Sequence, residues 1–106
     1  MAKYLIRANY SVEGLHGLLK EGGTGRRAAI EKLLGSVGGK VEALYYAFGE
    51  TDVYVLVEAP SNVTAAALSL IVSAAGAAKT SVTVLLTPEE IDEAVKMHPT
   101  YRPPGA

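Results

Sequence analysis

The sequence predicts an α+β fold: a four-stranded antiparallel sheet with two helices on one face, in the order βαββαβ, followed by a short helix. Alternating apolar residues mark four segments of strand length, and apolar residues at helical spacing fill the segments between them. Only four residues separate the second and third strand segments, so these strands form a hairpin. Right-handed crossovers then place both long helices on one face, which is the ferredoxin-like arrangement.

Length and composition limit the function classes. The 106 residues suit a single domain over 1–106, with 99–106 as an extended tail. Ten Lys and Arg against eleven Asp and Glu give a net charge of -1, which argues against nucleic acid or an anionic membrane as a partner. Cysteine is absent and histidine occurs twice, so no metal and no cofactor is expected. We expect a cytoplasmic location, because no segment resembles a signal peptide or a membrane span.

The first half of the chain predicts one strand and an interrupted helix. Side chains alternate over the strand Lys3–Tyr10, and Ser11 stands at the N-cap of the helix that follows. Gly22-Gly23 breaks this helix, and Thr24 caps a second piece, Gly25–Val37. The two predicted apolar stripes are Val12, Leu15 and Leu19, then Ile30, Leu33, Leu34 and Val37.

The second half predicts three strands and two helices. The strands are Val41–Phe48, Val53–Ala59 and Lys79–Leu86. Ser61 caps a helix that Gly76 closes, and Thr87 with Glu90 forms a capping box for a last helix ending before Pro99. The apolar stripes of these helices are Leu68, Ile71, Val72 and Ala75, then Ile91, Ala94 and Val95.

The two faces of the predicted sheet differ in character. The helix-covered face holds Ile6, Val53, Val55, Val57, Val82, Val84 and Leu86. The opposite face holds Leu5, Arg7, Asn9, Tyr54, Leu56, Glu58, Ser81, Thr83 and Leu85. The second set is too apolar to face solvent, and Arg7 and Glu58 are expected to pair across adjacent strands. We therefore expect a homo-oligomer, at least a dimer, whose sheets stack or close into a shared barrel.

Several segments together resemble the GYD family over nearly the whole chain. They are Lys3-Tyr4-Leu5, Gly17 to Thr24 with Arg26-Arg27, Phe48-Gly49 with Asp52-Val53-Tyr54, and Tyr101 to Gly105. At the signature that names the family, Gly49 and Asp52 are present and Thr51 stands where a tyrosine would. The resemblance implies the dimeric α+β-barrel architecture and no mechanism.

The segment Glu21–Arg27 is the most suggestive candidate site. Glycines at a helix start beside the guanidinium groups of Arg26 and Arg27 could bind an anion. The favoured interpretation is a helix break with a threonine cap and a basic rim. The spacing does not match a Walker motif.

Histidine and acidic residues offer the candidate catalytic groups. His16 and His98 each border an apolar stripe, so a packed imidazole is favoured over an acid-base group or a ligand for metal or haem. Asp52, with Glu50 beside it at the hairpin, is a candidate base. A carboxylate that accepts backbone N–H groups at the turn is favoured there.

Three classes of function follow. The first is a homo-oligomeric binding or interaction module for a small organic or anionic ligand, with Arg7, Tyr54 and Glu58 as the polar groups of a barrel lumen. The second is a cofactor-independent enzyme of isomerase or monooxygenase type in that lumen, using His16, Asp52 or Arg7. The third is a structural oligomer without a ligand. The tail from Thr100 to Ala106 is expected to contact a neighbouring subunit.

Overall fold

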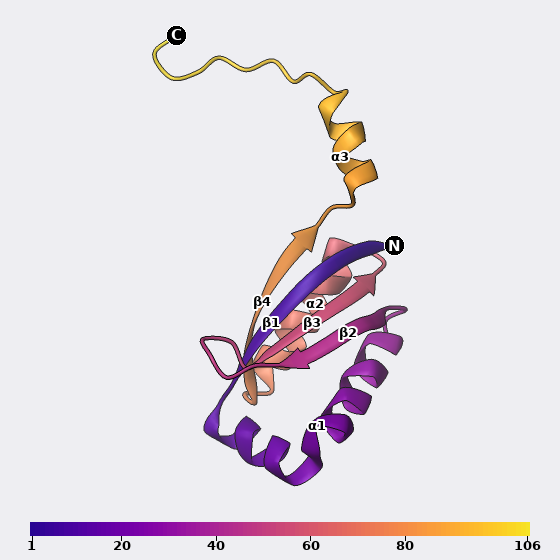
Figure 1. Ribbon diagram of the computed structural model, residues 1–106, viewed down its shortest axis with the longest axis vertical. Coiled ribbons are helices and arrows are strands. Elements are labelled where there is room, and N and C mark those ends of the chain that lie inside the picture. Colours follow the sequence, from indigo (N-terminus) through magenta and orange to yellow (C-terminus); the bar gives the residue numbers. More distant parts are fainter.

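The computed structural model describes residues 1–106 and has the predicted order of elements (Figure 1). The strands are β1 (Ala2–Tyr10), β2 (Lys40–Tyr46), β3 (Val53–Ala59) and β4 (Ala78–Leu85). The helices are α1 (Val12–Gly35), α2 (Asn62–Ala74) and α3 (Pro88–Val95). The strands lie in the order β2-β3-β1-β4, and every neighbouring pair is antiparallel. The α+β fold with ferredoxin-like element order is therefore confirmed.

The helix starts are the ones that the sequence predicts. The side chains of Ser11 and Ser61 accept the backbone N–H groups of the residues three positions later. Thr87 and Glu90 form the predicted capping box at the start of α3. Because each cap depends on residues within one turn, the local sequence is enough to specify it.

The predicted break in α1 is confirmed at Gly22, whose φ of 77° and ψ of 169° are not helical. A positive φ is accessible to glycine at little cost, and α1 is therefore two helical segments joined by a kink. The prediction that Thr24 caps the second segment is wrong. This segment begins directly after Gly22, so Thr24 lies within its first turn.

The core lies between the sheet and the helices. Its nine buried hydrophobic residues are Tyr4, Ala8, Leu34, Val53, Val55, Val57, Ala59, Ala65 and Leu68. β3 is an inner strand and its odd-numbered residues are all buried, as predicted. The prediction that Val84 and Leu86 are covered is wrong, since they are 52% and 58% exposed. Val84 lies near the end of the edge strand β4, and Leu86 lies just beyond it. α3 extends away from the sheet instead of folding over these two residues (Figure 1).

The first segment of α1 does not bury its apolar stripe, which corrects a second prediction. Val12, Leu15 and Leu19 are exposed, and it is Gly14 that is buried. A Cβ on Gly14 would lie 2.0 Å from the carbonyl oxygen of Ala77, so glycine permits this close approach. On α2, Ile71 is also exposed, although the sequence places it in the buried stripe.

The hairpin loop is longer than predicted, because β2 ends at Tyr46 rather than at Phe48. The Ala47 N–H donates to the carbonyl oxygen of Asp52 at 2.9 Å and closes the hairpin before Phe48, whose side chain is fully exposed.

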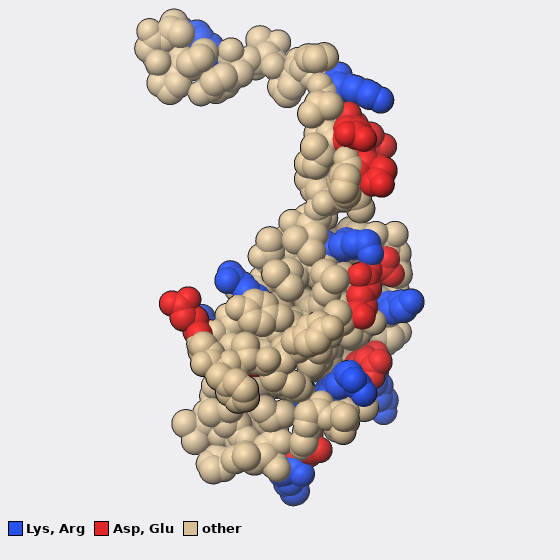
Figure 2. Space-filling model, viewed as in Figure 1, with Lys and Arg blue, Asp and Glu red and all other residues tan.

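The helix α3 and the residues after it project from the rest of the molecule (Figure 1). Figure 2 shows the acidic residues of α3 gathered on this projecting segment. No helix combines the length and the apolar character that a bilayer crossing requires.

Candidate functional site

A small cavity lies between the helices and the covered face of the sheet. Its volume is about 70 Å³, and eleven of its fourteen lining residues are hydrophobic. α1 packs chiefly on β2, whereas α2 packs chiefly on β4, so the middle of the sheet between them is incompletely filled. The small side chains Ala8 and Ala78 lie at this position on β1 and β4. Two alanines therefore face a gap between helices that pack on different strands, and their small side chains leave it open.

A wider hollow of about 390 Å³ adjoins this cavity, between the first segment of α1 and α2. The two spaces share the lining residues Tyr10, Arg26, Leu33, Val72 and Ala78. We call the two together the helix cleft. Its inner part is apolar, and Tyr10 and Arg26 stand where the inner part meets the outer.

The Tyr10 hydroxyl is buried in the cleft and has no hydrogen-bond partner. Burial raises the pKa of this phenol, and the neighbouring Tyr46 adds to the rise. The Arg26 guanidinium opposes it, both by its charge and by a contact with the phenol oxygen that falls outside hydrogen-bond geometry. The hydroxyl therefore stays protonated at neutral pH, which makes it a hydrogen-bond donor. An unpartnered buried hydroxyl typically costs about 1–3 kcal/mol.

Arg26 reaches the cleft because the kink at Gly22 redirects α1. The kink is held against β2 by the Tyr46 hydroxyl, which donates to the Gly23 carbonyl oxygen at 3.0 Å. A Cβ on Gly23 would lie 3.2 Å from the Tyr46 ring, so this approach is also close. Burial raises the pKa of Tyr46, while Arg26 and Arg27 oppose the rise. The nearest carboxylate oxygen to Arg26 belongs to Glu21, 3.8 Å from Nη1.

The opposite wall of the inner cavity carries a pair of hydroxyl groups. Ser69 Oγ on α2 and Thr80 Oγ1 on β4 lie 2.6 Å apart, and Ser73 Oγ lies 3.3 Å from the same Thr80 oxygen. These two hydrogen bonds use two of the three hydroxyl protons, and the third can reach solvent through the exposed Ser73, so this wall lacks a buried group without any partner such as the Tyr10 hydroxyl.

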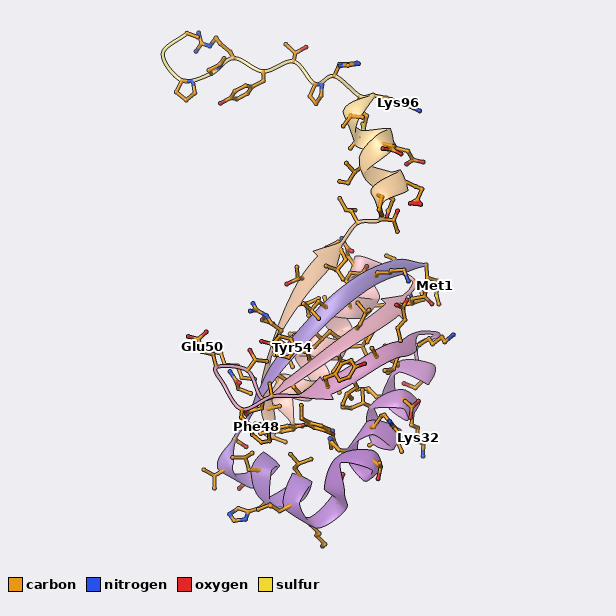
Figure 3. All side chains as sticks on the ribbon, viewed as in Figure 1. Met1, Lys32, Phe48, Glu50, Tyr54 and Lys96 are labelled. Carbon is orange, nitrogen blue, oxygen red and sulfur yellow. The ribbon has the colours of Figure 1, made fainter.

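Arg7, Tyr54 and Glu58, the residues expected to line a barrel lumen, lie on the face of the sheet away from the helices. Tyr54 projects from this open face in Figure 3, and it lies opposite Arg7 in the register of β1 and β3. The predicted Arg7–Glu58 pair is wrong, because Lys3 lies opposite Glu58. Lys3 Nζ lies 3.2 Å from Glu58 and also bonds Glu42.

Arg7 instead donates to Ser81 Oγ at 3.3 Å. The hydrogen bond from Lys3 lowers the pKa of Glu58, and the bonds to Glu42 and Glu58 raise the pKa of Lys3. The open face in the protomer is therefore an ion cluster beside apolar side chains, separated from the helix cleft by the sheet.

The candidate catalytic residues do not converge on the cleft. Asp52 Oδ2 accepts the backbone N–H of Tyr10 at 2.8 Å, so its carboxylate holds the end of β1 against the hairpin. Glu50 is exposed at the tip of the hairpin loop (Figure 3). His16 and His98 are exposed, so the interpretation of both as packed imidazoles is wrong. No group of three His, Asp or Glu side chains is arranged to hold a metal ion.

Of the two arginines in the segment Glu21–Arg27, only Arg26 lines the cleft. Arg27 is exposed and borders a separate hollow beside β2. Sequence reasoning missed Tyr10, Ser69 and Thr80. Their signal was available, because all three are polar groups at positions that the predicted periodicity turns toward the covered face of the sheet.

Comparison with known proteins gives a family and no nearer relative. The family model described as GYD domain matches residues 4–95 of the chain. No curated protein and no solved structure matches it.

Proposed function

Since the chain belongs to the GYD domain family, we propose that it is a homo-oligomeric module whose protomers each bind a small organic molecule in the helix cleft. The observation that carries this proposal is the Tyr10 hydroxyl, buried without a partner in an apolar cavity beside Arg26. Binding sites for small molecules are typically apolar cavities in which a few polar groups converge. A ligand acceptor would satisfy the hydroxyl and remove its cost.

The open face of the sheet supports the homo-oligomer. Leu5, Leu56 and Leu85 are only partly buried in the protomer, and the rings of Tyr45 and Tyr54 are exposed beside them. Apolar side chains grouped on one face typically mark a protein–protein contact. In this proposal the open faces of two copies pack together, and the helix cleft stays outside the contact.

The projecting helix α3 is a second observation that supports self-association. α3 has an apolar face with Ile91 and Val95 exposed, and it does not fold back on its own body (Figure 1). An isolated helix of eight residues is marginal in water. Packing of α3 and the tail against a neighbouring copy would bury this apolar face and would explain why so short a helix is formed and capped.

The other two classes have less support. An enzyme that uses His16 or Asp52 would need these side chains at the cleft, and the cavity lining includes neither. The raised pKa of Tyr10 suits a hydrogen-bond donor better than a base. A purely structural oligomer gives no reason for a cavity with an unsatisfied hydroxyl.

The test is a titration of the methyl-labelled protein with benzyl alcohol, followed by ¹³C–¹H correlation spectra. We expect saturable shifts at Ile30, Leu33 and Val72, which line the cleft, and none at Leu56 on the open face. Ala78→Leu fills the cleft and should abolish these shifts. The matched control is Ala43→Leu on β2, outside the cleft, which should bind normally. Saturable shifts confined to the open face would contradict the proposal.

A further inference from the structure

The polar groups of the cleft also indicate the charge of its ligand. We propose that the ligand is a small carboxylic acid, bound as its anion, with the carboxylate between the Arg26 guanidinium and the Tyr10 hydroxyl and the apolar body in the inner cavity. This inference rests on the proposed function and specifies the ligand class for the same site.

Arg26 has unused hydrogen-bonding capacity at the boundary between the two parts of the cleft. A guanidinium carries five N–H donors in a planar fork that fits a carboxylate in a bidentate manner. The contact to Glu21 at 3.8 Å is longer than a hydrogen bond, and the Arg26 side chain is 33% exposed. A ligand carboxylate can therefore reach the fork without breaking a close ion pair.

Tyr10 supplies a second donor at the same boundary. Its hydroxyl is buried and unpartnered, and hydrogen bonds from a hydroxyl to a carboxylate are short and strong. The nearby carboxylate of Asp52 already accepts a hydrogen bond from the backbone N–H of Tyr10. Two donors from different elements, β1 and α1, then converge on the same end of the cavity.

The charges of the lining favour an anion over a cation. Arg26 is the one charged residue that lines the inner cavity, and its other polar lining groups are Tyr10, Ser69 and Thr80. The carboxylates of Glu13 and Glu21 line only the outer hollow. A cation in the inner cavity would face a guanidinium with no carboxylate to balance it.

The cavity also limits the size of the apolar body. About 70 Å³ of space between Ile30 and Leu68 accommodates several non-hydrogen atoms of a ligand, and the wider outer hollow begins beside Arg26. The Ser69–Thr80 pair at the far wall is already satisfied, so that end needs no second charged group on the ligand. A single ring or a short branched chain with one carboxylate fits these constraints.

The experiment compares benzoate, benzyl alcohol and benzylamine by isothermal titration, with methyl spectra to locate each probe. We expect benzoate to bind the wild-type protein at least tenfold more tightly than benzyl alcohol, and benzylamine to bind most weakly. Arg26→Gln should remove the tenfold advantage of benzoate, and Tyr10→Phe should reduce it severalfold. The control is Arg27→Gln, which removes the neighbouring charge of the same helix and should leave the advantage intact.

Three results would overturn the inference. Equal binding of benzoate and benzyl alcohol, with shifts in the cleft, would refute the anion while the proposed function stands. An advantage of benzoate that survives Arg26→Gln but disappears in Arg27→Gln would refute the placement of the carboxylate. Binding of no probe to the cleft would refute both this inference and the proposed function. The amide spectrum of each variant establishes that it is folded.

Discussion

Tyr10 and Tyr46 are neighbouring tyrosines with opposite roles, and a pair of matched substitutions separates them. The Tyr10 hydroxyl is buried without a partner, whereas the Tyr46 hydroxyl bonds the kink of α1 through Gly23. We expect Tyr10→Phe to leave the ligand-free protein equally stable or about 1 kcal/mol more stable, because it removes an unsatisfied group.

Tyr46→Phe, by contrast, should cost about 1 kcal/mol, because it deletes a hydrogen bond that is made. Urea denaturation without ligand measures both values. A Tyr10→Phe variant that is the less stable of the two would show that the Tyr10 hydroxyl has a partner in solution.

The elements of this fold show which features depend on local sequence. The capping residues Ser11, Ser61 and Thr87, the break at Gly22 and the pairing of β2 with β3 in a hairpin were all predictable, because each depends on a few adjacent residues. The exposure of Leu15 was not, because Gly14 brings α1 against the carbonyl of Ala77, far along the chain.

The approach of α1 to this carbonyl is testable with two glycines one turn apart. Gly14→Ala would place a Cβ 2.0 Å from the Ala77 oxygen and should destabilise the protein by about 1–3 kcal/mol. Gly17→Ala has no atom within 4 Å of the added Cβ and should stabilise α1 by about 0.5–1 kcal/mol. Thermal unfolding of both variants checks the pair. Equal effects would mean that α1 is not docked at Gly14.

Lys3 joins three strands, and its pairing should make stability depend on pH at both extremes. The pKa of Glu58 is lowered, so its contribution is present above its ordinary value of 4.5 and is lost as the pH falls through the lowered value. The pKa of Lys3 is raised, so its contribution is present below 10.5 and is lost as the pH rises through the raised value.

Lys3→Met should therefore reduce the free energy of unfolding most at neutral pH, with the difference from wild type shrinking toward both extremes. Lys79→Met, on the same face and without a carboxylate partner, is the control and should show no such profile. Denaturant unfolding across the pH range measures both. A difference that does not change with pH would mean that the Lys3 pairs contribute nothing in solution.

At the scale of the whole molecule, we propose that the open face of the sheet packs against a second copy and that the helix-covered face binds the ligand. The sequence pattern correctly distinguished a covered face from an open one, because alternation in a strand fixes which residues share a side. It placed one candidate ligand site on the open face with Arg7, Tyr54 and Glu58 and another at Arg26 and Arg27, whereas the structure has its apolar cavity on the helix side, where it includes Arg26. The position of that cavity depends on which strands α1 and α2 pack against, which no local pattern encodes.

The open face can be tested as the contact between copies. Leu56→Lys introduces a charge at the centre of this face and should shift the protein toward monomer in sedimentation velocity at micromolar concentration. Leu70→Lys is the control, since Leu70 is exposed on α2, on the other side of the sheet. A wild-type protein that is monomeric, or a Leu56→Lys variant that associates as wild type does, would contradict packing through this face.

The most direct test of the account is where a bound acid lies in the protein. Intermolecular nuclear Overhauser effects between the ring protons of benzoate and labelled methyl groups report this position. We expect contacts to Ile30 and Leu68 in the helix cleft and none to Leu5 or Leu56 on the open face. Contacts confined to Leu5 and Leu56 would place the ligand between the sheets and contradict the helix cleft as the binding site.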